Sequence, residues 1–68
     1  MAPSFEVWQS PGGKRWAGED QEEAMLVARR SRRAGTVTEL AEVFNPSGEL
    51  RLRRLAHFDD RVRADRPL

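Results

Sequence analysis

Two proline–glycine turn signals constrain the fold of this chain more than any other feature. They are Ser10-Pro11-Gly12-Gly13-Lys14 and Asn45-Pro46-Ser47-Gly48-Glu49, and they begin 35 residues apart. Proline fixes φ at about −65°, as a type I turn requires, and glycine takes the left-handed conformation that follows. This pattern is typical of a β-hairpin with a three-residue loop. The sequence therefore predicts two hairpins with another element between them.

The first hairpin is predicted to pair Phe5–Ser10 with Lys14–Gly18. With a Pro-Gly-Gly loop, Trp8 lies opposite Trp16, and such a cross-strand aromatic pair stabilises a hairpin by roughly 0.2–1 kcal/mol. A register one residue different would pair Trp8 with Arg15 instead. We expect the register that pairs the two tryptophans.

The second hairpin is predicted to pair Thr36–Asn45 with Glu49–Phe58, with Phe44 facing Leu50 and Glu42 facing Leu52. The alternation of leucine and arginine over residues 50–53 is typical of a half-buried strand. Because Arg54-Leu55 breaks that alternation, a bulge or the end of the strand is expected there. One face is then expected to carry Phe44, Leu50 and Leu52, and the other Val43, Arg51 and Arg53.

A helix is predicted between the hairpins. Asp20 is the expected N-cap, Glu23 follows it as in a capping box, and Gly35 is the expected C-terminal stop. Acidic residues in the first turn and arginines near the end suit the helix dipole. Small side chains at helical spacing would let the helix lie close to a sheet, and these are Ala24, Val27, Ala28 and Ser31.

These elements predict an α+β fold of the order ββαββ, with one helix packed on a roughly four-stranded antiparallel sheet. Residues 1–58 form the single predicted domain, and residues 59–68 are expected to be a flexible polar tail. A competing interpretation makes Thr36–Phe44 the first helix of a helix-turn-helix unit, because Thr36 and Glu39 form another capping box. The second helix would then have to cross Pro46 and Gly48, which favours the hairpin.

Composition limits the functions that this chain can have. Twelve Lys and Arg against 11 Asp and Glu in 68 residues exclude a protein that coats polyanions through bulk charge. The absence of cysteine excludes disulfides and zinc–thiolate sites, and it fits the cytoplasmic location that we expect. No apolar run approaches the roughly 20 residues that span a bilayer, and residues 1–6 lack the pattern of a secretion signal. We therefore expect no membrane partner.

The chain has no recognisable catalytic set. His57 is its one histidine, and the adjacent Asp59 and Asp60 would point to opposite faces of an extended chain. Gly12-Gly13 lacks the context of a phosphate-binding loop, and one histidine with scattered acids does not make a metal site. We expect no enzyme, no cofactor, no metal and no small-molecule substrate.

The candidate binding surface consists of basic residues and one tryptophan. It could bind the phosphates of a nucleic acid, or its arginines could simply be solvated at a helix end. Trp8 and Trp16 are expected in the core, and the alternative is an exposed platform for stacking a base or a partner. The candidate residues are Lys14, Arg15, Trp16, Arg29, Arg30, Arg32, Arg33, Arg51 and Arg53.

The hairpin around Gly12-Gly13 with Trp16 nearby, the Glu-Glu-Ala helix and the closing Asn-Pro-Ser-Gly-Glu-Leu-Arg-Leu segment resemble a group of short, largely uncharacterised bacterial and phage domains. The resemblance covers about residues 4–55. It implies the ββαββ fold and no activity.

Open sheet edges in so small a domain favour a partner. Our first hypothesis is a non-catalytic regulatory module that docks on a larger protein or forms a homodimer, with Val62 and Leu68 of the tail ordering on binding. The alternative is a nucleic-acid-binding module that uses the arginines of the helix end and the strand face.

Overall fold

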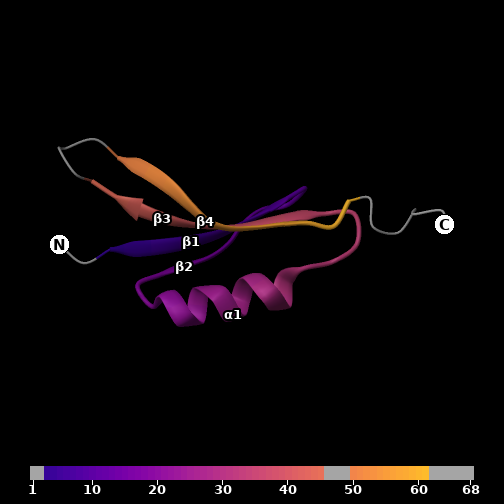
Figure 1. Ribbon diagram of the computed structural model, residues 1–68, viewed down its shortest axis with the longest axis horizontal. Coiled ribbons are helices and arrows are strands. Elements are labelled where there is room, and N and C mark those ends of the chain that lie inside the picture. The colour runs from indigo at the N-terminus through magenta and orange to yellow at the C-terminus, as the bar shows by residue number, and fades with distance from the viewer. Residues whose placement is uncertain (1–2, 46–49, 62–68) are drawn as a thin grey trace.

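A single antiparallel sheet with one helix on it makes up this protein. The computed structural model describes residues 3–45 and 50–61. Its elements are β1 (Ser4–Ser10), β2 (Gly13–Gly18), α1 (Gln21–Ser31), β3 (Val37–Phe44) and β4 (Arg51–Asp59). The strands lie in the order β2-β1-β3-β4, and α1 runs along one face of the sheet (Figure 1). The predicted ββαββ fold is confirmed.

Residues 36–44 do not form the helix of a helix-turn-helix unit, so that alternative is wrong. Val37–Phe44 is a strand, β3, that pairs with β1 on one side and with β4 on the other. Successive side chains of β3 alternate between the two faces, and Thr38 and Leu40 on one face are fully buried. Pairing on both sides outweighs the local helical signal because tertiary context overrides weak propensity.

The helix begins where the sequence predicts. The Asp20 carboxylate accepts hydrogen bonds from the backbone N–H groups of Glu22, at 2.9 Å, and Glu23, at 3.2 Å. The helix ends at Ser31, before the predicted stop, because Arg32 takes an extended backbone with ψ of 137°. Gly35 has φ of +87° and lies in the turn that leads to β3.

The core lies between α1 and the centre of the sheet. Ala24 and Ala28 of the predicted small-residue stripe are fully buried and face a cluster with Val7 and Leu40. Their small side chains let the helix approach the sheet closely. Gln9 is also buried, and its Nε2 donates to the Ser31 carbonyl and to Thr38 Oγ1, so it ties the end of α1 to β1 and β3.

The predicted pairing of Trp8 with Trp16 is wrong, and so is its alternative with Arg15. Gly13 belongs to β2 rather than to the loop, and Arg15 is the extra residue of a bulge. That one residue places the tryptophans on opposite faces of the sheet. The register pairs Gln9 with Gly13, Trp8 with Lys14 and Val7 with Trp16.

The register of the second hairpin also differs from the prediction by one residue. Phe44 pairs with Arg51 and Val43 with Leu52, so the expected grouping of Phe44 with the leucines is wrong. Leu52 instead lies on the face away from α1. The expected bulge is confirmed, because Leu55 is skipped between the pairs Leu40–Ala56 and Ala41–Arg54. The predicted turn at residues 46–49 lies outside the described residues.

Strand β4 and its contacts extend past the predicted domain boundary at residue 58. Strand β4 runs through Asp59, and Asp60 is buried. The Asp60 backbone donates to the Thr36 carbonyl at 2.8 Å and accepts from Gly35 N–H at 3.0 Å. The rest of the predicted tail, residues 62–68 with Val62 and Leu68, lies outside the described residues.

Candidate interaction surfaces

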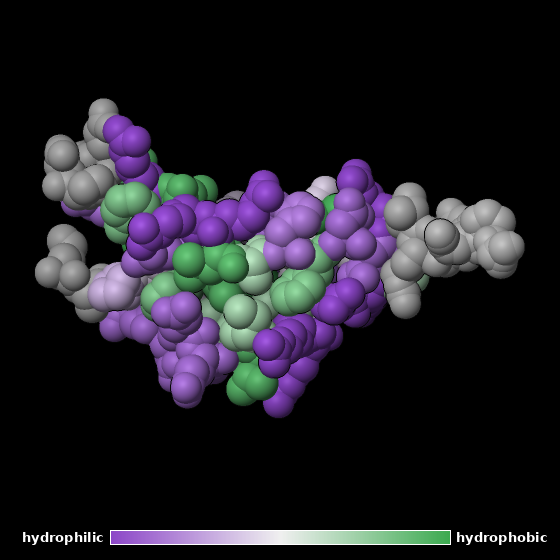
Figure 2. Space-filling view, viewed as in Figure 1, coloured by the Kyte–Doolittle hydropathy of each residue, from purple (hydrophilic) through white to green (hydrophobic). Residues whose placement is uncertain are grey.

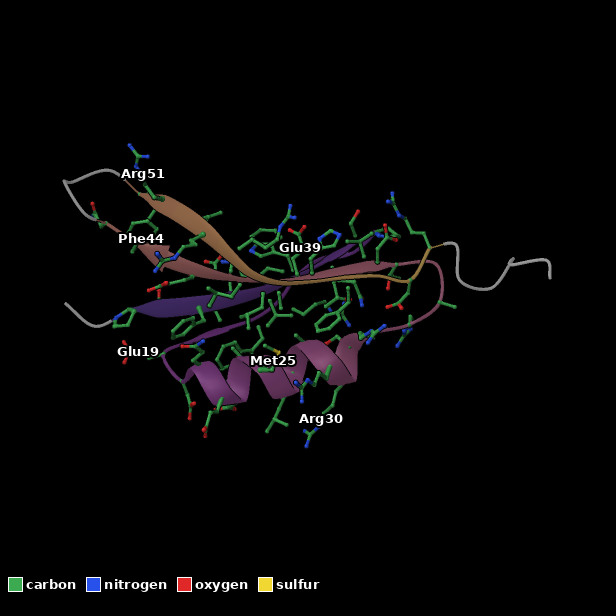
Figure 3. All side chains as sticks on the ribbon, in the orientation of Figure 1. Glu19, Met25, Arg30, Glu39, Phe44 and Arg51 are labelled. Carbon is green, nitrogen blue, oxygen red and sulfur yellow. The ribbon has the colours of Figure 1, made fainter. Side chains whose placement is uncertain are left out.

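The structure separates the predicted basic surface into distant parts. Arg51 begins β4, whereas Arg32 at the end of α1 contacts Asp60, nine residues further along. At about 3.3 Å per strand residue, these two points are roughly 30 Å apart. In Figure 3, Arg30 lies on α1 and Arg51 lies at the far end of β4. The helix-end arginines and the strand arginines therefore do not form one surface.

The arginines at the end of α1 differ in what they contact. The Arg32 guanidinium binds Asp60 with two hydrogen bonds, of 3.1 and 2.8 Å, and its Cζ lies 4.6 Å from the centre of the Phe58 ring. The hydrogen bond to Asp60 raises the pKa of Arg32 above its ordinary value. Within residues 3–45 and 50–61, Arg29, Arg30 and Arg33 have no ion pair and are exposed. They remain a solvated basic helix end.

The face of the sheet away from α1 carries a row of interacting side chains. Lys14 Nζ lies 5.5 Å from the centre of the Trp8 ring and 3.3 Å from Glu6, which also accepts a 2.7 Å hydrogen bond from Trp8 Nε1. On the next strands, Glu39 contacts His57 Nδ1 at 2.8 Å and an Arg54 nitrogen at 3.2 Å. Trp8 is 40% exposed here, so the core prediction is wrong for Trp8, whereas Trp16 is partly buried against the core.

A cavity of about 350 Å³ adjoins this row. Arg61 at its rim forms hydrogen bonds of 2.9 and 2.7 Å with Asp59, and this contact lowers the pKa of Asp59 to about 2. No described hydroxyl is hydrogen-bonded to His57, so the His57–Glu39 pair has no positioned nucleophile among the described residues. The lining residues are Trp8, Gln9, Ser10, Val37, Glu39, His57 and Arg61.

Strand β4 and Leu50, which directly precedes it, carry the largest concentration of exposed apolar side chains among the described residues. Leu50 is 74% exposed, Leu52 59% and Leu55 37%. Among the described strands, only β3 pairs with β4, and α1 packs against β1, β2 and β3 without reaching β4. The sheet is wider than one helix can cover, because four strands span about 19 Å and a helix about 10 Å. Consequently β4 is both an edge and an uncovered strand.

The side of β4 that faces α1 continues this apolar character. Ala56 and Phe58 of β4 and Met25 of α1 are only partly buried. Figure 2 shows apolar side chains between the sheet and the helix, bordered above and below by hydrophilic ones. The hydrophilic residues of β4 nearest its start are arginines, namely Arg51, Arg53 and Arg54.

Sequence reasoning missed this surface because it placed Leu50 and Leu52 on a buried face. The alternation was read correctly as a strand, but burial also depends on which strand the helix covers. The arginines within residues 51–54 did indicate an edge strand, because charged residues are common on edge strands.

Comparison with protein-family models, with curated proteins and with solved structures finds no match to this chain. The described part of the chain contains no group of three or more histidine and acidic side chains placed to hold a metal ion. None of its helical segments has the length and apolarity needed to cross a membrane.

Proposed function

We propose that this chain is a small non-catalytic binding module that docks on a larger protein through β4. The observation that carries the proposal is the position of β4, a nine-residue strand that lies at the sheet edge with its leucines exposed. Unpaired edge groups and clustered apolar side chains are both features of protein-binding surfaces. A domain of 68 residues also has a small core, so docking would add to its stability.

Site-specific cross-linking tests this function. A photo-reactive phenylalanine analogue replaces Leu52 in one variant and Leu26 in another, and cross-links are collected in the source cell. Leu26 is the matched control because it is 50% exposed but lies on α1, away from β4. We expect a discrete protein adduct from position 52 and none from position 26.

A second pair of variants checks that the adduct reports binding. Leu52→Asp should abolish capture of the cross-linked protein, and Leu26→Asp should leave capture unchanged. Equal capture by both variants, or adducts only from position 26, would contradict docking through β4.

Nucleic-acid binding is the second candidate function, and the exposed helix end favours it. Arg29, Arg30 and Arg33 have no ion pair within the described residues and lie within five positions of one another. Arginine clusters of this kind bind phosphates, and their affinity falls steeply with salt. Fluorescence anisotropy with single-stranded and duplex oligonucleotides at low salt tests this. Binding that weakens on raising the salt and on Arg30→Glu supports it, and no binding at low salt rules it out.

A further inference from the structure

We propose that the partner adds an extended segment to β4 as a fifth strand, and that this segment carries carboxylates at one end and apolar side chains at the other. The inference rests on the proposed function and specifies the chemistry of the partner. It follows from the free edge of β4, from the distribution of its side chains and from its charge.

The backbone of β4 offers a long line of hydrogen-bonding groups. Strands β1 and β3 each pair with a neighbour on both sides. Strand β4 pairs with β3 on one side, and no described strand pairs with its other side. Its nine residues give an edge roughly 30 Å long. An added strand would pair these backbone N–H and C=O groups, which is how extended peptides bind other open sheets.

The bulge at Leu55 divides this edge into two chemically different halves. The half before the bulge carries Arg51 and Arg53 on the α1 side of the sheet, beside Phe44 and Glu42. The half after the bulge carries Ala56 and Phe58 on that side, where they pack against the core. An added strand that runs antiparallel to β4 would therefore have its apolar residues near its N-terminus, opposite Ala56 and Phe58. Its acidic residues would lie near its C-terminus, opposite Arg51 and Arg53.

Arg53 and Arg54 of the first half have N–H donors beyond those that contact the glutamates of β3. Arg53 binds Glu42 through Nε and one NH₂ group, at 3.2 and 2.6 Å, and Arg54 reaches Glu39 at 3.2 Å. A guanidinium has five N–H donors, so one carboxylate does not satisfy it. The Arg53 and Arg54 side chains are 62% and 60% exposed and are accessible to a second carboxylate.

A second copy of this chain is a poor occupant of the same edge. A parallel pair of β4 strands would place Arg51, Arg53 and Arg54 opposite their own copies, and like charges across strands are destabilising. Charged residues and a bulge are also the devices that protect edges from pairing with copies of themselves. A nucleic acid would satisfy the arginines but would leave the β4 backbone edge and the leucines unpaired. An acidic, partly apolar strand pairs the backbone edge, binds the arginines and places its apolar side chains beside Ala56 and Phe58.

The test uses the full chain and the capped peptide Thr-Val-Thr-Val-Thr-Glu-Thr-Glu, with binding followed by amide NMR. We expect shifts and slower amide exchange along residues 51–59. A peptide with lysine in place of glutamate should bind at least tenfold more weakly. A peptide with N-methyl groups on the amides that would pair with β4 should lose binding, because it keeps the charges and cannot form the strand.

Variants of the chain test whether the positive charges that bind the peptide lie on β4. Arg53→Glu should weaken peptide binding at least fivefold, whereas Arg30→Glu makes the same charge change on α1 and should leave it unchanged. Equal binding of the lysine or N-methyl peptide, shifts confined to other elements, or a β4-paired dimer in light scattering would overturn the inference. If cross-linking at position 52 still captures a protein in that case, docking through β4 stands and only the partner's chemistry is wrong.

Discussion

Arg32 and Asp60 join the end of the helix to the end of the last strand. The Asp60 carboxylate is buried and receives two hydrogen bonds from the Arg32 guanidinium, of 3.1 and 2.8 Å. The Asp60 backbone bonds to Gly35 and Thr36, so one residue holds the α1–β3 connection against β4. The Arg32 guanidinium also lies over the Phe58 ring of β4, so both contacts join the end of the helix to the last strand.

The first prediction concerns this link. Asp60→Asn keeps the side-chain volume and removes the charge, so it should lower Tm by roughly 5–15 °C in thermal unfolding. Glu19→Gln is the control, because it makes the same kind of change at an exposed residue that has no ion pair within residues 3–45 and 50–61. Equal melting temperatures for the two variants would show that the link does not contribute to stability.

The second prediction contrasts the two tryptophans. Trp16→Ala should lower the free energy of unfolding by about 2–3 kcal/mol, because Trp16 packs against the core. Trp8→Ala should cost less than about 1 kcal/mol, because Trp8 is 40% exposed. Urea unfolding measures both changes, and fluorescence of the single-tryptophan variants should place Trp16 in the less polar environment. A larger loss for Trp8 would contradict the observed register.

The third prediction is that Gly18→Ala lowers the stability of the protein, which is the opposite of the usual effect of this substitution in a strand. Replacing a strand glycine by alanine usually stabilises, but a Cβ at Gly18 would lie 2.7 Å from the Trp16 ring. Gly18→Ala should therefore lower stability by roughly 1–3 kcal/mol. In the Trp16→Ala background the same substitution should be neutral or stabilising, and a loss that persists there would assign the effect to the backbone instead.

The fourth prediction concerns pH. The hydrogen bonds from Arg61 lower the pKa of Asp59 from 3.8 to about 2. A group with a lowered folded pKa stabilises above its unfolded pKa, and that contribution is lost as pH falls from about 4 towards 2. NMR titration of the Asp59 carboxyl should give a pKa near the lower value, and Arg61→Gln should return it towards 3.8. An unchanged pKa in that variant would mean that Arg61 is not the cause.

Local signals in the sequence determined the elements of this fold. The Asp20 cap, the small-residue stripe of α1 and the turn around Gly12 each depend on a few neighbouring residues, and the structure confirms the elements that they predicted. The break in alternation at Leu55 likewise marked a bulge correctly.

Only the tertiary structure decided on which face of the sheet each side chain lies and which strand lies at the edge. One extra residue at Arg15 placed Trp8 and Trp16 on opposite faces, because side chains alternate along a strand and a single insertion reverses them. The exposure of Leu52 follows from pairing between β1 and β3, which are distant in sequence and leave β4 at the edge beyond the helix. The sequence by itself determined where strands and helix form, through short-range backbone and capping preferences. Which side chains remain free to bind depended on long-range pairing, and no local pattern carries that information.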